Sequence, residues 1–251
     1  MTAVIDRPAE LTQHNEFSDA ESDTVWWGSP DIAFTPAFWA KVTRLSDENA
    51  FETHRLTDSL ASECVMCLLG GHGIPAEHGI AAFHALSEAG LLNAFEPPPL
   101  AAITKVLEEP IGLPSGHAIK YRFAKQKSRY IANFLHSFEE PHDLDHWENV
   151  AIRDWLVGFD GIGLKTASWI VRNWFDADDV AILDIHVIRA GVLAGFFDRE
   201  DTLPRDYRKM EEKYLSFAKA IGVRPSLLDA VIWDQMRRAG RLAVRLFQSH
   251  L

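Results

Sequence analysis

The sequence predicts an all-α protein, and three observations support this fold class. Apolar residues recur at helical spacing in successive segments of the 251-residue chain. Glycine, proline and aspartate clusters of the kind that ends helices separate these segments. Runs in which β-branched residues alternate with polar ones do not recur, so no substantial sheet is expected.

The expected helices follow one another from residue 36 onward. Residues 1–24 are polar and acidic with little periodicity, and we expect them to form a disordered or loosely attached tail. The ordered part begins near Trp26, and a single unit of residues 25–251 is expected. The segments with helical periodicity are 36–45, 48–69, 76–89, 98–108, 117–137, 145–157, 163–175, 185–196, 206–220 and 226–247.

Composition limits the class of protein. With 47% hydrophobic residues, the chain can bury a large core. We see no signal peptide and no apolar run long enough to cross a membrane, so we expect a cytoplasmic protein with no membrane partner. Only two cysteines are present, which does not suggest a secreted disulfide scaffold.

The two cysteines, Cys64 and Cys67, form a C-x-x-C motif. A zinc or iron–sulfur site needs about four ligands, and the chain has no second cysteine pair. Apolar neighbours such as Leu60, Val65 and Leu68 indicate a buried helix instead. We therefore expect core packing here and no metal site.

The net charge of −11 argues at first against a nucleic-acid partner. Net charge is an average, however, and binding depends on one face of the molecule. Two basic clusters can hold phosphates or can simply be solvated helix faces. They are Lys120, Arg122, Lys125, Lys127 and Arg129, with interleaved aromatic residues, and Arg237, Arg238, Arg241 and Arg245. The acidic balance predicts modest non-specific affinity and marked salt sensitivity.

A glycine pair separates two helical patterns in Gly161-Ile162-Gly163. These glycines give the backbone freedom and leave N–H groups uncovered at the start of the second helix. Such a helix start binds phosphate, because its amides lack internal partners and the helix dipole is positive there. The alternative is a turn that serves only to pack two helices.

Residues 156 to 187 together resemble the helix-hairpin-helix (HhH-GPD) DNA glycosylase superfamily. The matching residues are Leu156-Val157-Gly158, Gly161-Ile162-Gly163, Lys165 and Leu183-Asp184-Ile185-His186-Val187. Within the superfamily, the chain is most similar to the compact 8-oxoguanine glycosylases that lack an extra β domain. The resemblance implies two helical subdomains with an active-site cleft between them. One would span about 60–174 and carry the hairpin, and the other would combine 25–59 with 178–251.

Lys165 distinguishes subclasses within this superfamily. The resemblance implies a bifunctional enzyme in which the Lys165 amine attacks the sugar C1′, displaces the base and forms a Schiff base. The amine must be neutral to attack; burial and positive dipoles favour that form, whereas a nearby aspartate favours the charged one. Without the resemblance, a solvated or phosphate-contacting lysine would be the simpler interpretation.

Asp184 stands directly before the apolar-periodic run 185–197, where a helix N-cap is expected. It can serve only as a cap. The resemblance implies that its ionised carboxylate also stabilises positive charge developing on the sugar. The resemblance further implies DNA contacts, in addition to the hairpin glycines Gly161 and Gly163, from Thr166, His186 and Arg189.

Asp229 and Trp233 are candidates for the pocket that holds the base. Their i, i+4 spacing places them on one helix face, and the resemblance implies a similar pair in the compact 8-oxoguanine enzymes. Unlike guanine, 8-oxoguanine carries a hydrogen on N7, so an acceptor such as Asp229 would distinguish the two. A buried tryptophan and a helix-start aspartate are the alternative. Trp169, four residues after Lys165, is a third candidate.

The sequence therefore predicts a DNA glycosylase and AP lyase that excises 8-oxoguanine from damaged double-stranded DNA in base excision repair. We expect a monomer that needs no metal or organic cofactor and associates with the nucleoid if the cell is bacterial. The chain ends in His250-Leu251, whereas some compact 8-oxoguanine enzymes place a C-terminal lysine in the pocket. A glycosylase for a different base and a non-catalytic DNA-binding protein are the alternatives.

Overall fold

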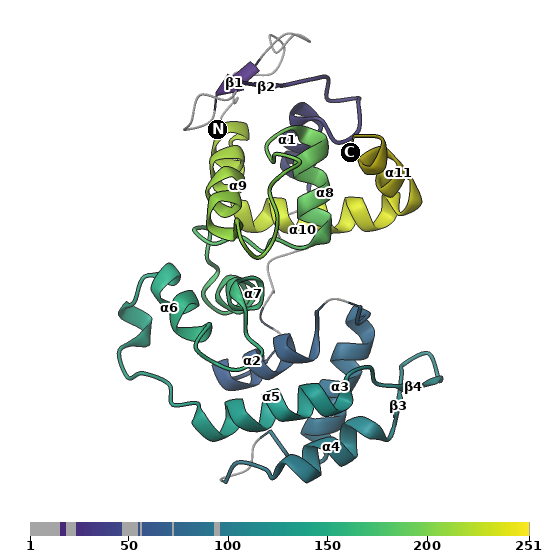
Figure 1. Ribbon diagram of the computed structural model, residues 1–251, viewed down its shortest axis with the longest axis vertical. Coiled ribbons are helices and arrows are strands. Elements are labelled where there is room, and N and C mark those ends of the chain that lie inside the picture. Colours follow the sequence, from purple (N-terminus) through teal and green to yellow (C-terminus); the bar gives the residue numbers. More distant parts are fainter. Residues whose placement is uncertain are drawn as a thin grey trace, which may run out of the picture. The chain divides into compact units, whose positions relative to one another are not determined.

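The computed structural model describes residues 16–18, 24–46, 55, 57–71, 73–92 and 96–250. Helices dominate these residues, and their strands form two short antiparallel pairs, β1–β2 and β3–β4 (Figure 1). The predicted all-α class is confirmed. The chain divides into two compact units, which we call the terminal unit (Met1–Glu52 with Asp178–Leu251) and the middle unit (Thr53–Ala177).

The middle unit is built around one buried helix. Leu60, Cys64, Val65, Leu68 and Leu69 are all buried, because α2 is mostly apolar and is covered by α3, α5 and α7. The elements of this unit are α2 (Leu60–Leu69), α3 (Ala76–Glu88), α4 (Leu100–Glu108), β3 (Pro110–Gly112), β4 (Ala118–Lys120), α5 (Ala124–Ser137), a short 3-10 turn (Leu144–His146), α6 (Asn149–Leu156) and α7 (Leu164–Phe175).

The C-x-x-C motif lies within α2. Cys64 and Cys67 are free and buried, and burial raises the pKa of both thiols well above the ordinary value. Such thiols are poor metal ligands and nucleophiles, because the reactive form is the thiolate. The prediction that the cysteines belong to the core is confirmed.

The terminal unit packs α8 and α9 across α10 (Figure 1). Trp39 of α1 is fully buried, and the Phe196 ring stacks on Phe217 with centroids 4.0 Å apart. These aromatic contacts give the unit a core of its own. Its elements are β1 (Glu16–Ser18), β2 (Thr24–Trp26), α1 (Pro36–Leu45), α8 (Ile185–Ala194), α9 (Tyr207–Ile221), α10 (Pro225–Ala239) and α11 (Arg241–His250).

Three predicted helices were too long. In the described part of the segment 48–69, the helix begins at Leu60, after the N-cap Ser59; residues 47–54 and 56 lie outside the described part. The segment 117–137 contains β4 and then turns at Phe123, which has φ 65°. The segment 226–247 is broken at Gly240, which has φ 51°. At Phe123 and Gly240 apolar spacing continues across a backbone turn, so periodicity alone does not reveal the break.

Of the predicted tail, residues 1–24, only Glu16–Ser18 and Thr24 are described. Glu16–Ser18 form β1 and pair antiparallel with Thr24–Trp26. The rest of the tail lies outside the described residues. In the described part, no helix is both long and apolar enough to span a membrane.

Candidate active site

The turn between α6 and α7 depends on one of its two glycines. Gly161 has φ +85°, and a Cβ there would lie 2.4 Å from Cδ2 of Tyr130 on α5. Gly163 has an ordinary φ of −92°, and a Cβ there would meet nothing within 4 Å. Asn133 of α5 also donates a hydrogen bond to Asp160 in the turn, at 3.0 Å. Only Gly161 therefore supplies backbone freedom, which corrects the expectation that both glycines do.

The start of α7 presents uncovered amides. Gly163 is its N-cap and has no side chain to accept a hydrogen bond, although its carbonyl accepts one from the Ala167 amide at 2.9 Å. The first-turn N–H groups of a helix lack intrahelical acceptors, and the dipole there is positive. The helix start is open on the Gly163 side, so it can receive an anion such as a phosphate. Thr166 lies half-buried in the same turn.

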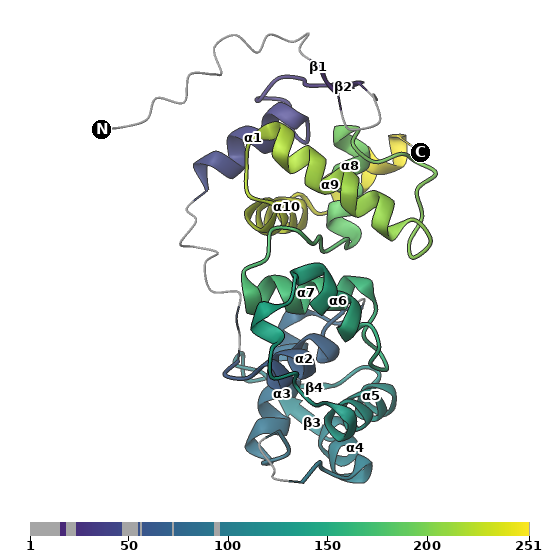
Figure 2. The same cartoon turned by 90° about the vertical axis from the view of Figure 1, so that its left-hand side faces the viewer.

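The helices α6 and α7 lie side by side (Figure 2). Lys165 is half-buried in the first turn of α7, beside an aromatic ring. Its Nζ is 5.4 Å from the centroid of the Trp169 ring, one helical turn along. Trp169 in turn packs against Gly70 at the end of α2, where a Cβ would come within 2.9 Å of the ring. The helix α2 thus supports the ring against which the Lys165 amine lies.

A second amine lies close to Lys165. Lys127 Nζ donates hydrogen bonds to the carbonyls of Leu68, at 2.5 Å, and Gly70, at 3.0 Å. Burial and then repulsion by Lys165 lower the pKa of Lys127 to about 8. In the sequence Lys127 is only a member of a basic cluster, because no local spacing relates it to Lys165 and only the fold brings the two charges near each other.

Asp184 caps α8, as the sequence predicts. Its Oδ1 accepts hydrogen bonds from the amides of His186, at 2.8 Å, and Val187, at 2.9 Å. Among the described residues, no group donates to Oδ2. One oxygen of the carboxylate therefore fixes the helix start, and the other remains available to a substrate.

The first turn of α8 adjoins α10. The ring of His186 lies 6.4 Å from that of Trp233, and the Arg237 guanidinium lies 5.1 Å from the Trp233 ring centroid. Trp233 is 41% exposed, whereas Asp229, one turn earlier, is only 8% exposed. Trp233 therefore offers an aromatic face to a ligand, and Asp229 would have to act from a buried position.

Each unit holds its own group of the predicted site residues. The middle unit brings together Gly161, Gly163, Lys165, Thr166 and Trp169, and the terminal unit holds Asp184, His186, Arg189, Asp229 and Trp233. The roles assigned to these residues stay predictions. No cluster of three or more histidine, cysteine or acidic side chains suited to a metal ion occurs among the described residues.

An all-α chain with a glycine hairpin that presents an amine at a helix start defines a helix-hairpin-helix protein. Residues 42–223 match the family model Ogg-HhH, described as 8-oxoguanine DNA glycosylase. The match covers more than half of the chain, so the chain belongs to this family. The resemblance inferred from residues 156 to 187 is confirmed.

Curated relatives agree with this assignment. The chain is 34% identical over 119 residues to an 8-oxoguanine DNA glycosylase/AP lyase of Thermoplasma volcanium, across 46% of this chain and 57% of the relative. It is 32% identical over 118 residues to one of Methanocaldococcus jannaschii, across 45% and 56% of the two chains. The chain thus spans little more than half the length of these relatives.

Solved structures share the fold. The 8-oxoguanine DNA glycosylase of Thermotoga maritima aligns with a TM-score of 0.61 at 24% identity, over 78% of this chain and 94% of that one. The Methanocaldococcus jannaschii 8-oxoguanine glycosylase/lyase in complex with a 15mer DNA containing 8-oxoguanine aligns with a TM-score of 0.55 at 22% identity, over 78% and 87%. At these identities the likeness shows the fold.

Proposed function

We propose that this protein is a bifunctional DNA glycosylase and AP lyase that excises 8-oxoguanine from duplex DNA in base excision repair. The family membership supports the reaction class, and the relatives named above act as 8-oxoguanine glycosylase/AP lyases. The observation that carries the proposal is the place of Lys165. Its amine lies in the first turn of α7, directly after a hairpin suited to hold DNA.

The first chemical step is base displacement. The neutral Lys165 amine attacks C1′ of the flipped nucleotide, and the bond between C1′ and the base breaks, with the electron pair leaving on the base. The lysine nitrogen gives up one proton once it is bonded to C1′, and the departing base takes up a proton. The free Oδ2 of Asp184 would stabilise the positive charge that develops on the sugar in this step.

The second step is strand cleavage. The hemiaminal at C1′ then breaks its bond to the ring oxygen, which takes up a proton and becomes a hydroxyl, and a protonated Schiff base with Lys165 forms. Removal of a proton from C2′ then expels the 3′ phosphate by β-elimination. The anion-binding start of α7 would hold the backbone in register during both steps.

Base recognition in this proposal uses aromatic faces. Trp233 is exposed and can stack on the extruded base, while Asp229 is the acceptor proposed for the N7 hydrogen. Trp169 lies beside Lys165 and offers a second ring near the amine. Damaged double-stranded DNA is thus the proposed partner. We also propose that the protein is a monomer. We propose that it works in the cytoplasm, on the nucleoid if the cell is bacterial, because chromosomal DNA would be its substrate.

Borohydride trapping tests the proposal. Duplex DNA with one 8-oxoguanine opposite cytosine is incubated with protein and borohydride, which reduces a Schiff base to a stable amine. We expect a covalent protein–DNA adduct with the native chain and none with Lys165→Gln. Lys127→Gln is the matched control, because it removes a neighbouring amine that the proposal does not use as nucleophile.

The outcomes separate the alternatives. An adduct on abasic DNA but not on the 8-oxoguanine duplex would keep the lysine chemistry and assign a different base. Base release without any adduct would indicate a glycosylase that uses water as nucleophile. Binding without either reaction would leave a non-catalytic DNA-binding protein.

A further inference from the structure

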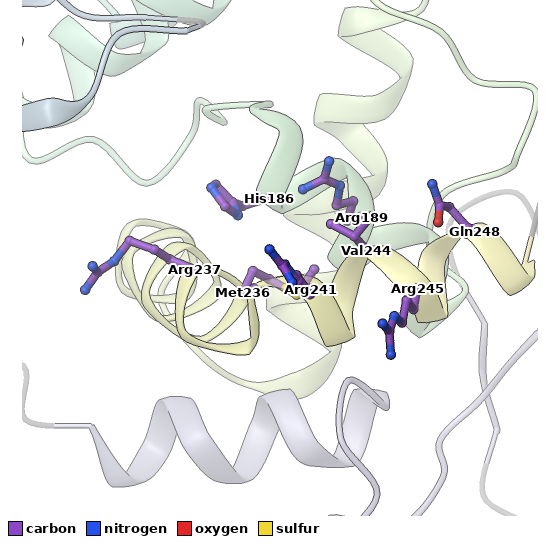
Figure 3. Close-up of a pocket in the computed structure, with 9 residues that line it drawn as sticks. His186, Arg189, Met236, Arg237, Arg241, Val244, Arg245 and Gln248 are labelled. Atoms are coloured by element: carbon purple, nitrogen blue, oxygen red, sulfur yellow. The ribbon is translucent and has the colours of Figure 1, made fainter.

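A cationic pocket lies in the terminal unit among α8, α10 and α11. It encloses about 550 Å³, and we call it the arginine pocket (Figure 3). Arg189 of α8, Arg237 of α10, and Arg241 and Arg245 of α11 line it, together with His186. Pockets of this size hold groups as large as a nucleotide fragment.

The charges in this pocket are largely uncompensated. No carboxylate lines it. Arg237 lies 3.5 Å from Asp234 on its own helix, but no carboxylate among the described residues forms an ion pair with Arg189, Arg241 or Arg245. Several cations therefore gather at one place in a chain whose net charge is −11. Packing of the helices does not require such a gathering of positive charge.

The start of α11 adds a second positive element. Arg241 is the first residue of α11, and no acidic residue lies in the first turn. A cation at a helix N-terminus opposes the dipole and costs stability. A bound anion would be favoured both by the dipole and by Arg241, so a ligand explains an arrangement that folding alone disfavours.

Two buried nitrogen atoms in the pocket lack partners. Arg189 Nε and His186 Nδ1 are inaccessible to solvent and make no hydrogen bond in the described structure. An unpaired buried polar group destabilises the fold unless a ligand supplies its partner. Both nitrogens belong to side chains that line the pocket, and a phosphate group has several acceptor oxygens.

The arginine pocket adjoins an exposed aromatic face. His186 belongs to the pocket and lies 6.4 Å from the ring of Trp233, and Arg237 lies over that ring. A nucleic-acid strand offers both groups in sequence, since each base is attached to a backbone phosphate. An isolated inorganic ion would use the arginines but not the tryptophan.

We propose that the arginine pocket binds a backbone phosphate of the DNA strand whose base contacts Trp233. This inference rests on the proposed function and extends it with a phosphate site on α11. Arg241 and Arg245 supply the charge, one helical turn apart. Arg189 and His186 direct hydrogen bonds to the phosphate oxygens.

The salt dependence of DNA affinity tests this site. Binding is measured by fluorescence anisotropy at several salt concentrations, on a duplex with a tetrahydrofuran abasic analogue that cannot form a Schiff base. Each lost phosphate contact lowers the slope of log affinity against log salt by about 0.9. We expect the doubly substituted Arg241→Gln, Arg245→Gln chain to lose about 0.9 from that slope, because both arginines contact the same phosphate. The Arg241→Lys, Arg245→Lys chain should keep it, because lysine retains the charge.

Lys219→Gln is the matched control, because Lys219 is an exposed cation of the same unit that lies outside the pocket. It should leave the slope unchanged. Circular dichroism establishes that each variant is folded. A folded Arg241→Gln, Arg245→Gln chain with the native slope would overturn the proposal.

Two further measurements separate the possible failures. Inorganic phosphate alone is titrated while the melting temperature is followed. If the glutamine substitutions abolish stabilisation by phosphate but leave the DNA slope intact, the pocket binds a small anion and not DNA. Release of 8-oxoguanine is assayed in parallel. No release by the native chain, with a slope that still falls in the variant, would refute the proposed reaction and keep the phosphate site.

Discussion

Gly161 and Gly163 are the same residue type two positions apart, yet the structure gives them different tasks. Gly161 adopts φ +85° and lies against the Tyr130 ring, whereas Gly163 adopts φ −92° and faces open space. The first glycine shapes the hairpin, and the second leaves the start of α7 uncovered. Sequence reasoning identified both but could not divide these tasks, because φ and the distant Tyr130 are not visible in local spacing.

Alanine substitution separates the two glycines. Gly161→Ala should lower the free energy of unfolding by about 1–3 kcal/mol or more, because a Cβ is strained at positive φ and collides with Tyr130. Gly163→Ala should cost less, about 0.5–1 kcal/mol, because alanine is a poorer N-cap than glycine although its Cβ would meet nothing within 4 Å. Urea denaturation measures both. Equal losses in the two variants would contradict this division of tasks.

The pH dependence of stability reports on Lys127. Its pKa falls to about 8 in the folded chain from an ordinary value of 10.5, mainly through burial. Between these values the unfolded chain holds a proton that the folded chain has released, so Lys127 makes stability rise with pH in that window. Lys127→Met should lose this rise, measured as the free energy of unfolding in urea at pH 7 and pH 9.5.

Lys125→Met is the control for that experiment. Lys125 lies on the same helix, is 85% exposed and lies 3.8 Å from Glu108. Its substitution should preserve the native rise between the two pH values. If Lys127→Met and the native chain respond equally to pH, the buried amine does not titrate as described.

Asp184 begins the helix α8 as its cap, and substitutions at this position test whether its carboxylate also takes part in the reaction. Asparagine caps about as well as aspartate, so Asp184→Asn should leave stability nearly unchanged. It removes the charge, and release of 8-oxoguanine should slow by about 100-fold or more. Denaturation and single-turnover base release measure the two effects.

Asp184→Ala completes the comparison. It removes the cap hydrogen bonds to the His186 and Val187 amides and should cost about 0.5–2 kcal/mol of stability. If Asp184→Asn releases base at the native rate, Asp184 is a cap and no more.

The sequence predicted which segments form helices better than it predicted the residues at which those helices begin and end. The Asp184 cap and the start of α7 follow from residue types that act locally. The turns at Phe123 and Gly240 were missed, because apolar spacing runs through them and the chain direction changes for tertiary reasons. That second break matters for function, since it creates α11 and brings Arg241 and Arg245 beside Arg189.

For the whole molecule, the family followed from about one eighth of the chain, because the hairpin, Lys165 and Asp184 are short-range patterns. The distribution of the basic residues over the folded chain could not be predicted from the sequence. The sequence shows a net charge of −11 and two basic clusters, but the first cluster is divided among β4, a turn and α5, while part of the second lines one pocket. Only folding decides which of these cations share a surface.

The whole chain should therefore bind DNA through a few cations in an acidic molecule, and its affinity should depend steeply on salt. The one phosphate held by Arg189, Arg241 and Arg245 predicts about a 3.5-fold loss of affinity between 50 and 200 mM salt, and each further phosphate contact multiplies that loss by about the same factor. Undamaged duplex should follow a similar slope from a weaker starting affinity, because phosphate contacts do not depend on sequence. Anisotropy titrations with damaged and undamaged duplexes measure both slopes. An affinity that is flat across this range would mean that base contacts alone hold the DNA.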